Sequence, residues 1–364
     1  RSLGAMIRQM DPTQVYVVFD GAGSANNRKN INPLYKSGRD LQRITNWDAF
    51  DDKRDEDDSK VDQMVRVIQY LKTLPVKTVS IDKVEADDII AYLCNKVIND
   101  PKDKAFIVSS DKDFIQLVND NVIVYRPMEK EYYTEQTVID KYKMSPKNFI
   151  LHKTLLGDNS DKIKGVKGLG EKGLYKKFPE LMERDMNLED IFTICEAKLK
   201  DHVVYARVLQ NMEEMEKNYK IMDLDNPMIS KKEEEYLDKL VNSDIPPYLP
   251  EQFVAFYNQD KLGGMIRNVE FWVKEIFEKL DLENEKTEIR YESLYDLYLK
   301  QQYEEVLTQG EDLLIIFSGS PLVSKVAHLM ANASGRLDGI EAWKEKLNNL
   351  IEIYPNSEAS SQAK

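Results

Sequence analysis

Histidine and cysteine are scarce in this sequence. Three histidines and two cysteines occur among 364 residues, at His152, His202, His328, Cys94 and Cys195. The histidines are not spaced as metal ligands, and both cysteines lie in apolar helical patterns that are typical of buried free thiols. The sequence therefore argues against a metal site built from histidine and cysteine, and its cysteine usage fits a reducing cytosol.

Long apolar runs are also absent from the sequence. No stretch approaches the roughly 18 consecutive apolar residues that a membrane-spanning helix needs, and no signal peptide is visible. A charged fraction of 32% with a net charge of −13 is typical of a soluble protein. This acidic total is weak evidence against a nucleic-acid partner, because a local basic patch can coexist with it. Hydrophobic residues make up 42%, which is enough for a packed core, and the length predicts more than one domain.

Short apolar runs alternate with helical patterns in the first part of the chain. Residues 15–19, 76–81, 105–108 and 122–125 are rich in apolar and β-branched side chains, which predicts buried strands. Strands that alternate with helices are typical of a mostly parallel sheet that helices cover on both faces. The fold class that we predict for residues 1–145 is therefore α/β.

Several carboxylates lie directly after the predicted strands, where each strand ends. In an open α/β sheet that edge is where ligands bind, and carboxylates that share one space repel each other unless a cation lies between them. Each acid taken alone could equally be a helix cap or a turn residue, but the shared placement favours a metal site. Carboxylate oxygens without histidine or cysteine are typical of Mg²⁺ ligands. The predicted metal ligands are Asp20, Glu85, Asp87, Asp88, Asp111, Asp113, Asp158 and Asp161.

A glycine-rich turn at residues 165–170 opens onto a predicted helix. Backbone N–H groups in such a turn can bind a phosphate group, although most glycine-rich turns are only turns. Six lysines crowd residues 162–177, and two of the predicted metal ligands precede the turn. The combination favours phosphate binding over a plain turn.

The character of the sequence changes to helices after Pro146, and it changes again near a charged linker at residues 282–290. Beyond the linker, two helical patterns begin 37 positions apart, at Tyr303 and Ile340. This period resembles that of tetratricopeptide repeats, although a plain four-helix tail fits the pattern too. We expect residues 291–364 to form an all-α tail.

Five motifs follow one another along the chain, at Val17–Gly21, Pro33–Arg39, Glu85–Asp88, Ser109–Phe114 and Gly157–Gly170. Any one of them is a modest signal, but five in this order are specific. Together they resemble the flap endonuclease and 5′-to-3′ exonuclease superfamily, especially its bacteriophage members and the 5′-nuclease domain of bacterial DNA polymerase I.

The resemblance covers about residues 1–281 and implies a PIN-like sheet with an acidic pocket for two Mg²⁺ ions, for which Mn²⁺ can substitute. It assigns catalytic roles to Lys36, at the base of a helical arch formed by the mobile segment 40–62, and to Arg39, one turn further on. The implied activity is hydrolysis of DNA that carries a 5′ flap or a 5′ single-stranded end, in replication or repair. The implied location is the cytoplasm of a bacterial or phage-infected cell.

The resemblance also implies how the chain binds duplex DNA. Residues 155–178 match the family's helix-hairpin-helix motif, within a helical DNA-binding region at residues 146–281. This motif grips phosphate groups, often with a bound K⁺ ion. The predicted DNA-binding residues are Arg28, Lys162, Lys164, Gly165, Lys167, Gly168, Gly170 and Lys172.

The sequence departs from the family's pattern at its start. The family opens with a strand that ends in an aspartate, and nothing before Val15 matches that strand, so we expect the chain to be truncated and one metal ligand short. Three alternatives therefore stay open. The chain could be a non-catalytic, structure-specific DNA-binding module, or a PIN-like ribonuclease, which should lack the glycine-rich hairpin. The tail could also be the functional part, as a scaffold that binds a protein partner.

Overall fold

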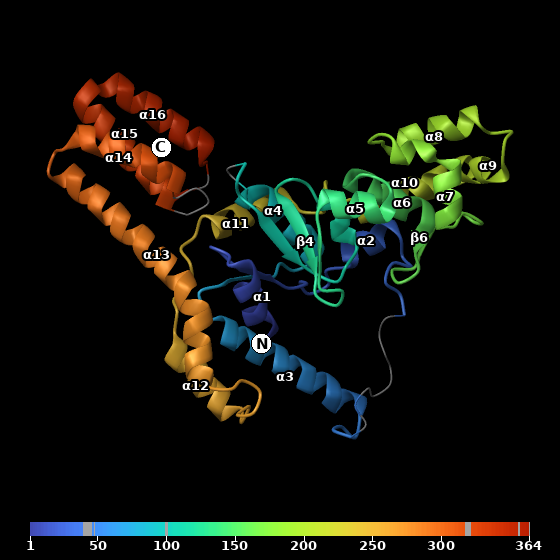
Figure 1. Ribbon diagram of the computed structural model, residues 1–364, viewed down its shortest axis with the longest axis horizontal. Coiled ribbons are helices and arrows are strands. Elements are labelled where there is room, and N and C mark those ends of the chain that lie inside the picture. The colour runs from blue at the N-terminus through green and yellow to red at the C-terminus, as the bar shows by residue number, and fades with distance from the viewer. Residues whose placement is uncertain (39–45, 47, 99–100, 317–321, 356, 364) are drawn as a thin grey trace. The chain divides into compact units, whose positions relative to one another are not determined.

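Figure 1 shows the computed structural model, which describes all residues except 39–45, 47, 99–100, 317–321, 356 and 364. The chain divides into two compact units, each built from segments that lie far apart in the sequence. The domain boundaries drawn from the sequence stay predictions. The first unit comprises Arg1–Val17, Arg43–Val79 and Lys231–Lys364, and the second comprises Val18–Gln42 and Ser80–Ser230.

The second unit contains a three-stranded sheet. β3 (Ala105–Val108) pairs in parallel with β4 (Val122–Arg126), in a register that places Ala105 opposite Val122. β4 pairs antiparallel with β5 (Glu131–Tyr133), so the strand order is β3-β4-β5. The strands predicted at residues 105–108 and 122–125 are therefore present, and β5 is an added antiparallel strand.

Only one face of β3 is buried. Ala105 and Ile107 lie in the core, whereas Phe106 and Val108 are 37% and 43% exposed. This alternation is typical of a strand with one covered face, and it differs from the prediction of a fully buried strand. Four consecutive apolar residues hide a period of two, so the sequence does not distinguish the two kinds of strand.

Helices pack on this sheet and complete its core. α4 (Ala86–Val97) carries its two aspartates in the first turn and buries an apolar face further along, which is the pattern that predicted a helix. The 3-10 helix η1 (Asp113–Leu117) packs on α4, and α5 (Glu135–Tyr142) packs on β5. The buried core comprises Ala91, Cys94, Ala105, Ile107, Phe114, Ile115, Leu117, Val118, Val122, Val124, Tyr133, Val138, Phe149 and Leu224.

The rest of the second unit is mainly helical, as predicted for the residues after Pro146. A short antiparallel pair, β6 (Gly157–Asp158) and β7 (Ile163–Lys164), leads into the glycine-rich turn. A separate core that includes Leu155, Phe178 and Val208 holds the surrounding helices together. These are α2 (Asn26–Ile31), α6 (Phe149–Leu156), α7 (Glu171–Lys177), α8 (Leu188–Ala197), α9 (Val203–Gln210) and α10 (Met212–Met222), with η2 (Pro146–Asn148) and η3 (Pro179–Met182).

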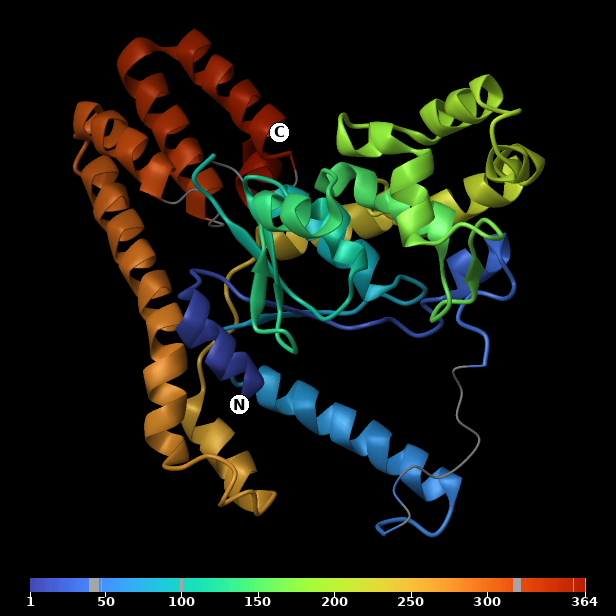
Figure 2. The ribbon, with the colours of Figure 1, turned by 45° about the vertical axis from the view of Figure 1, so that its right-hand side comes forward.

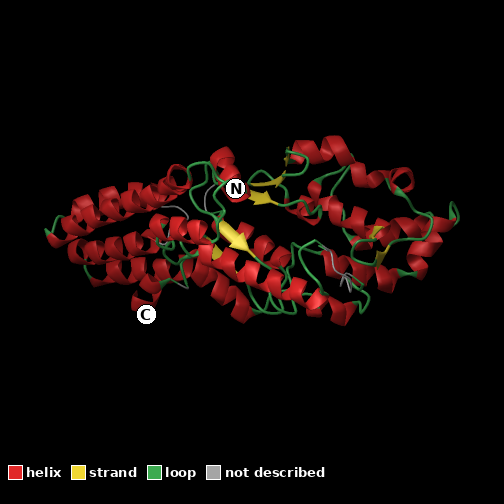
Figure 3. Ribbon diagram, turned by 90° about the horizontal axis from the view of Figure 1, so that it is seen from below, coloured by secondary structure: helices red, strands yellow, loops and turns green. Residues whose placement is uncertain are grey.

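The first unit combines one two-stranded sheet with long helices, and Figure 3 shows how far helices outweigh strands in the chain. β1 (Tyr16–Val18) lies beside β2 (Lys77–Val79), where strands were predicted. The helices of this unit are α1 (Ser2–Met10), α3 (Lys53–Leu71), α11 (Lys231–Val241), α12 (Pro250–Gln259), α13 (Val269–Leu299), α14 (Tyr303–Ile316), α15 (Leu322–Asp338), α16 (Ile340–Ile353) and α17 (Glu358–Ala363).

The C-terminal tail is all-α, as predicted. α14 packs on α13 and α15, and α16 packs on α15, as Figure 2 shows in orange and red. Residues 282–290, predicted as a charged linker, are helical and lie within the continuous helix α13. Leu, Glu, Lys and Arg make up most of that stretch and are good helix formers. The domain boundary placed there stays a prediction.

Two further predictions concern the cysteines and membrane-spanning helices. Cys94 and Cys195 are free and buried, as predicted. In the part of the chain that the structure describes, no helix has both the length and the apolar composition needed to cross a membrane.

Candidate active site

Asp20 and Gly21 bring the chain after β1 against the loop before α4. Asp20 Oδ1 accepts a hydrogen bond of 2.8 Å from the backbone N–H of Ala86, and the Gly21 N–H donates to the Val84 carbonyl at 3.1 Å. A Cβ atom on residue 21 would lie 1.7 Å from the carbonyl oxygen of Ile81, so the approach requires glycine. The Asp-Gly pair therefore places an exposed carboxylate beside the first turn of α4.

Glu85, the N-cap residue of α4, is 2% exposed and fully paired. Its carboxylate lies 2.6 Å from Lys36 Nζ and 2.7 Å from Arg28, and it accepts a hydrogen bond of 3.1 Å from the Tyr35 hydroxyl. Burial and the charge of Glu85 raise the pKa of Tyr35, so this hydroxyl keeps its proton and donates it. Such pairing is what allows a buried carboxylate to stay ionised.

Lys36, predicted to be catalytic, therefore reaches the acidic site. Its backbone is in the left-handed region, with a φ of 51°, and its N–H donates to the Asp161 carbonyl at 3.0 Å. A residue other than glycine that is held there is strained, and such strain is common at functional sites. Arg39, the second predicted catalytic residue, lies outside the described residues.

Asp88 and Arg28 form a buried ion pair. Arg28 donates to Asp88 through NH1 at 2.5 Å and NH2 at 2.9 Å, and its Nε donates to the Ile221 carbonyl at 2.8 Å. Asp88 also accepts from the Met228 N–H at 3.0 Å. Arg28 is 3% exposed and Asp88 is 1% exposed. In this arrangement the guanidinium of Arg28 is taken up by protein partners, and Asp88 is taken up by Arg28 and the Met228 N–H. The DNA-binding role of Arg28 and the metal-binding role of Asp88 stay predictions.

Asp87 and Asp111 lie close enough for their charges to interact. Burial, and then the charge of Asp111, raise the pKa of Asp87 to about 7. Asp111 is exposed, and its Oδ1 accepts a hydrogen bond of 2.9 Å from the Asp113 N–H. Carboxylates that disfavour each other's ionisation form a place where a cation is stabilised.

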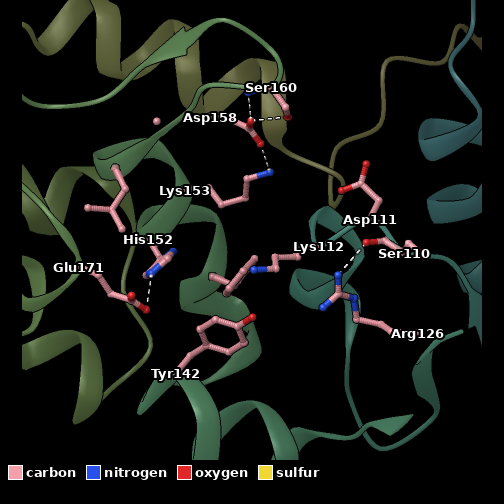
Figure 4. Close-up of a pocket in the computed structure, with 13 residues that line it drawn as sticks. Ser110, Asp111, Lys112, Arg126, Tyr142, His152, Lys153, Asp158, Ser160 and Glu171 are labelled. Atoms are coloured by element: carbon pink, nitrogen blue, oxygen red, sulfur yellow. Dashed lines mark hydrogen bonds and ion pairs between the residues drawn. The ribbon is translucent and has the colours of Figure 1, made fainter. Parts of the chain in front are cut away.

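Lys153, which the sequence analysis did not single out, forms ion pairs with Asp113 and Asp158. Lys153 on α6 is 9% exposed; its Nζ contacts Asp113 Oδ1 and lies 2.9 Å from Asp158 Oδ2. Figure 4 shows the Lys153 side chain directed at Asp158. Burial alone would raise the pKa of Asp158, but hydrogen bonds from Ser160 and Lys153 hold it at about 2. The sequence did contain a signal for this contact, because Lys153 is the one charged residue in the apolar run of α6. A buried charge needs a partner, so an acidic side chain was to be expected beside it.

The carboxylates predicted to bind metal come from four segments of the chain, but several of them form ion pairs with basic side chains. Among the residues that the structure describes, no three His, Cys, Asp or Glu side chains are placed to hold one metal ion. Glu85 is paired with Lys36, and Asp113 and Asp158 are paired with Lys153. These three carboxylates do not fit a metal ion in the arrangement that the structure shows.

Asp20, Asp87 and Asp111 are the carboxylates that fit a cation better. Neither Asp87 nor Asp111 is paired with a basic side chain within the described ranges, and burial, followed by the charge of Asp111, raises the pKa of Asp87. Their oxygen-only donor set suits Mg²⁺ or a similar divalent ion. Asp161 is buried and contributes its backbone: its N–H donates to Asp158 Oδ1 at 3.3 Å and its carbonyl accepts from Lys36.

Side chains from α10 and α9 hydrogen-bond to the backbone of the segment that contains the glycine-rich turn. Asn218 Nδ2 donates to the Lys164 carbonyl at 2.8 Å, and Arg207 donates to the Lys167 carbonyl at 2.7 Å. Gly168 has a φ of 82°, a conformation that favours glycine. The predicted DNA-binding lysines of this region, Lys162, Lys164, Lys167 and Lys172, are all exposed.

Gly165 has a packing role beyond its predicted contact with DNA. A Cβ atom at this position would lie 2.2 Å from the carbonyl group of Leu156 and 2.5 Å from the backbone nitrogen of Gly157. We expect Gly165→Ala to lower the free energy of unfolding by about 1–3 kcal/mol, as overpacking does elsewhere, measured by urea denaturation. Gly170→Ala is the control, because open space surrounds that position. Equal stability of the two variants would contradict the close approach at Gly165.

Comparison with known proteins shows what the chain resembles. The family model of the 5′-3′ exonuclease N-terminal, resolvase-like domain matches residues 1–143, which are less than half of the chain. This part of the chain is therefore similar to that domain. A 5′-3′ exonuclease of Aquifex aeolicus (strain VF5) is 33% identical over 181 residues, which cover 49% of this chain and 57% of the relative. The chain thus spans little more than half the length of this curated relative of the exonuclease family.

More distant exonuclease relatives cover a larger share of the chain. A 5′-3′ exonuclease of Mycoplasmopsis pulmonis (strain UAB CTIP) is 27% identical over 265 residues, 70% of this chain and 83% of the relative. A flap endonuclease of bacteriophage T5, solved with DNA and metal ions, matches with a TM-score of 0.51 and 21% identity, over 77% of this chain and 89% of that one. This likeness confirms the PIN-like α/β fold. The tetratricopeptide resemblance of the tail is not confirmed.

Proposed function

We propose that this chain is a structure-specific 5′ nuclease that hydrolyses DNA phosphodiester bonds with divalent metal ions. The observation that carries the proposal is the meeting of carboxylates from four segments of the second unit next to Lys36. Hydrolysis of a phosphodiester needs neutralisation of charge and an activated water, and metal-binding carboxylates support both. The names of the relatives, 5′-3′ exonuclease, support the same activity.

The carboxylates that would hold metal are Asp87 and Asp111, with Asp20 beside them. Glu85 and Asp113 would join them only by exchanging their lysine partners for a metal ion. When bound, two Mg²⁺ ions would neutralise the phosphate and lower the pKa of a water molecule, and Mn²⁺ would substitute for Mg²⁺. Asp158 and Asp161 would act through water. Asp88 is left out of this set because Arg28 takes both of its oxygens.

Lys36 would contact the phosphate that is cut. Its side chain is 20% exposed and already within 2.6 Å of Glu85, so its charge lies at the edge of the acidic site. A fixed ammonium group there stabilises the negative charge that grows in the transition state. Arg39 would also stabilise that negative charge, and the product would carry a 5′-phosphate.

The exposed lysines around the glycine-rich turn would hold the duplex. Lysine side chains and backbone N–H groups bind phosphates without reading the sequence of bases, as expected for an enzyme that recognises the structure of DNA. The preferred substrates would be a 5′ flap or a 5′ single-stranded end. Binding of K⁺ at residues 165–170 stays a prediction.

Removal of divalent metal tests the proposed function. We expect the full chain to cut a 5′-flap DNA in Mg²⁺ and to lose all cleavage in excess chelator, with recovery when Mg²⁺ or Mn²⁺ is added back. The assay resolves labelled products on a denaturing gel. Cleavage that continues in excess chelator would refute a metal-dependent mechanism. A gel shift of the same DNA without cleavage in Mg²⁺ would favour a non-catalytic binding module instead.

The Lys36→Ala variant tests the role of Lys36 in the chemical step. We expect its single-turnover rate constant to fall by about 10²–10³, as when one charge-stabilising donor is removed, with a much smaller change in the dissociation constant for DNA. Lys29→Ala is the control, because Lys29 is an exposed lysine of the neighbouring helix α2. Equal losses in rate and in binding would show that Lys36 acts only in holding DNA.

We propose the bacterial or phage-infected cytoplasm as the location, which the bacterial origin of the relatives supports. The tail would bind a protein partner or have no role in cleavage. Deletion of residues 283–364 is not a clean test of this, because it cuts through the continuous helix α13.

A further inference from the structure

A cavity of about 620 Å³ extends from the acidic site into the helical part of the second unit. Asp111 and Asp158 line one end of it, and Tyr142, His152 and Glu171 line the other, as Figure 4 shows. Binding sites for small molecules typically measure about 300–1,000 Å³, so the cavity is large enough for one organic ligand. The metal site proposed above uses only its acidic end.

Aromatic rings form the far wall of the cavity. His152 stacks on Phe149, with ring centroids 5.3 Å apart and an interplanar angle of 11°, and Tyr142 meets both rings edge to face. Both ring nitrogens of His152 are buried without a hydrogen-bond partner, and its Nε2 lies 3.8 Å from the Glu171 carboxylate. A buried imidazole without a partner is costly, which points to a ligand that supplies a donor or an acceptor.

Cationic groups also line the cavity. Arg126 is 7% exposed; it donates to the Ser110 carbonyl at 2.8 Å and pairs with Glu129, but its buried Nε has no hydrogen-bond partner. Lys112 is exposed and also lines the cavity, and Figure 4 shows it between Arg126 and His152. An unused donor next to an exposed ammonium group suits a phosphate or another anion.

We infer that this cavity binds a single nucleotide, a deoxynucleoside 5′-monophosphate, with its base toward His152 and Tyr142 and its phosphate toward Lys112 and Arg126. A nucleotide combines what the two walls require: a planar ring with a hydrogen-bonding edge, and an anion. The position beside Asp111 and Asp158 is where a cut strand would present its terminal nucleotide. In that respect the inference rests on the proposed nuclease function.

Binding of thymidine 5′-monophosphate to the full chain tests the inference. Binding is measured by titration calorimetry. A chelator is present so that the phosphate group cannot bind through a metal ion. We expect saturable binding that is at least about tenfold tighter than that of thymidine or inorganic phosphate, because each of these fills only part of the cavity. Equal affinity for inorganic phosphate would show an anion site only, and no saturable binding of the nucleotide would overturn the inference.

Two variants separate the two walls. His152→Phe keeps a ring against Phe149 but removes both nitrogens, so we expect it to weaken nucleotide binding about tenfold and to leave phosphate binding unchanged. Lys112→Ala is expected to weaken both ligands by a similar factor. Lys200→Ala, an exposed lysine outside the cavity, is the control. Unchanged nucleotide binding in both cavity variants would place the ligand elsewhere and refute the proposal.

The cavity and the nuclease function can fail independently. Cleavage of flap DNA in Mg²⁺, measured on the same preparation, reports the nuclease function alone. Cleavage without nucleotide binding would overturn only the cavity. Nucleotide binding that the His152→Phe and Lys112→Ala variants weaken would support the cavity even in a chain that does not cut DNA.

Discussion

Alanine in place of Asp111 is expected to slow the cleavage of 5′-flap DNA about a thousandfold, because a carboxylate that holds a catalytic metal supplies several kcal/mol of transition-state stabilisation. Asp111 is exposed and follows β3 in a loop, so its loss leaves the core of the second unit in place. The loss is therefore expected in the single-turnover rate constant, and the urea midpoint of unfolding is expected to change little.

Asp111→Asn distinguishes binding of metal from support of the loop. Asparagine keeps an oxygen that can accept the hydrogen bond from the Asp113 N–H, but it carries no charge. We expect it to be nearly as inactive as the alanine variant. Asp120→Ala, which removes an exposed carboxylate from a turn of the same unit, is the control for net charge. Activity close to normal in Asp111→Asn would mean that the residue only shapes the loop.

The acids of the site could be predicted because their signal is local. Asp20, Glu85 and Asp111 each stand a few residues beyond a strand, and a strand is visible as a short apolar run. The prediction that these strand ends meet assumed one parallel sheet. The structure instead has β1-β2 and β3-β4-β5 as separate sheets. A local signal also located the glycine-rich turn, since its glycines and lysines are adjacent in sequence.

The pairing of these acids could not be predicted, because it depends on contacts between distant segments. Arg28 lies 60 positions from Asp88, and Lys153 lies 40 positions from Asp113. Sequence spacing within one helix indicates which side chains are neighbours, but tertiary packing decides which charges meet across helices. The sequence predicted that Arg28 binds DNA, whereas packing against α10 buries it in this structure.

Removal of the Asp88 carboxylate is expected to destabilise the fold strongly, by more than the Gly165→Ala substitution does. Asp88→Ala leaves the guanidinium of Arg28 buried with Glu85 as its remaining charged partner. It also deprives the Met228 N–H of its acceptor. Breaking a buried ion pair by removing one partner costs about 3–5 kcal/mol, since the other charge stays desolvated. We expect a loss of this size in the free energy of unfolding from urea denaturation.

Asp140→Ala is the matched control for Asp88→Ala, because Asp140 is exposed and its carboxylate accepts a hydrogen bond from the neighbouring Gln136 side chain. Its free energy of unfolding is expected to change by no more than about 0.5 kcal/mol.

The double variant Arg28→Met with Asp88→Leu is expected to regain part of the lost stability, since neither charge is then left unpaired, although Glu85 loses one of its partners. If Asp88→Ala kept its stability but lost cleavage, Asp88 would be a metal ligand, as the sequence predicted. Loss of stability together with retained cleavage below the unfolding midpoint would assign Asp88 to the fold, which is the result that its buried pairing leads us to expect.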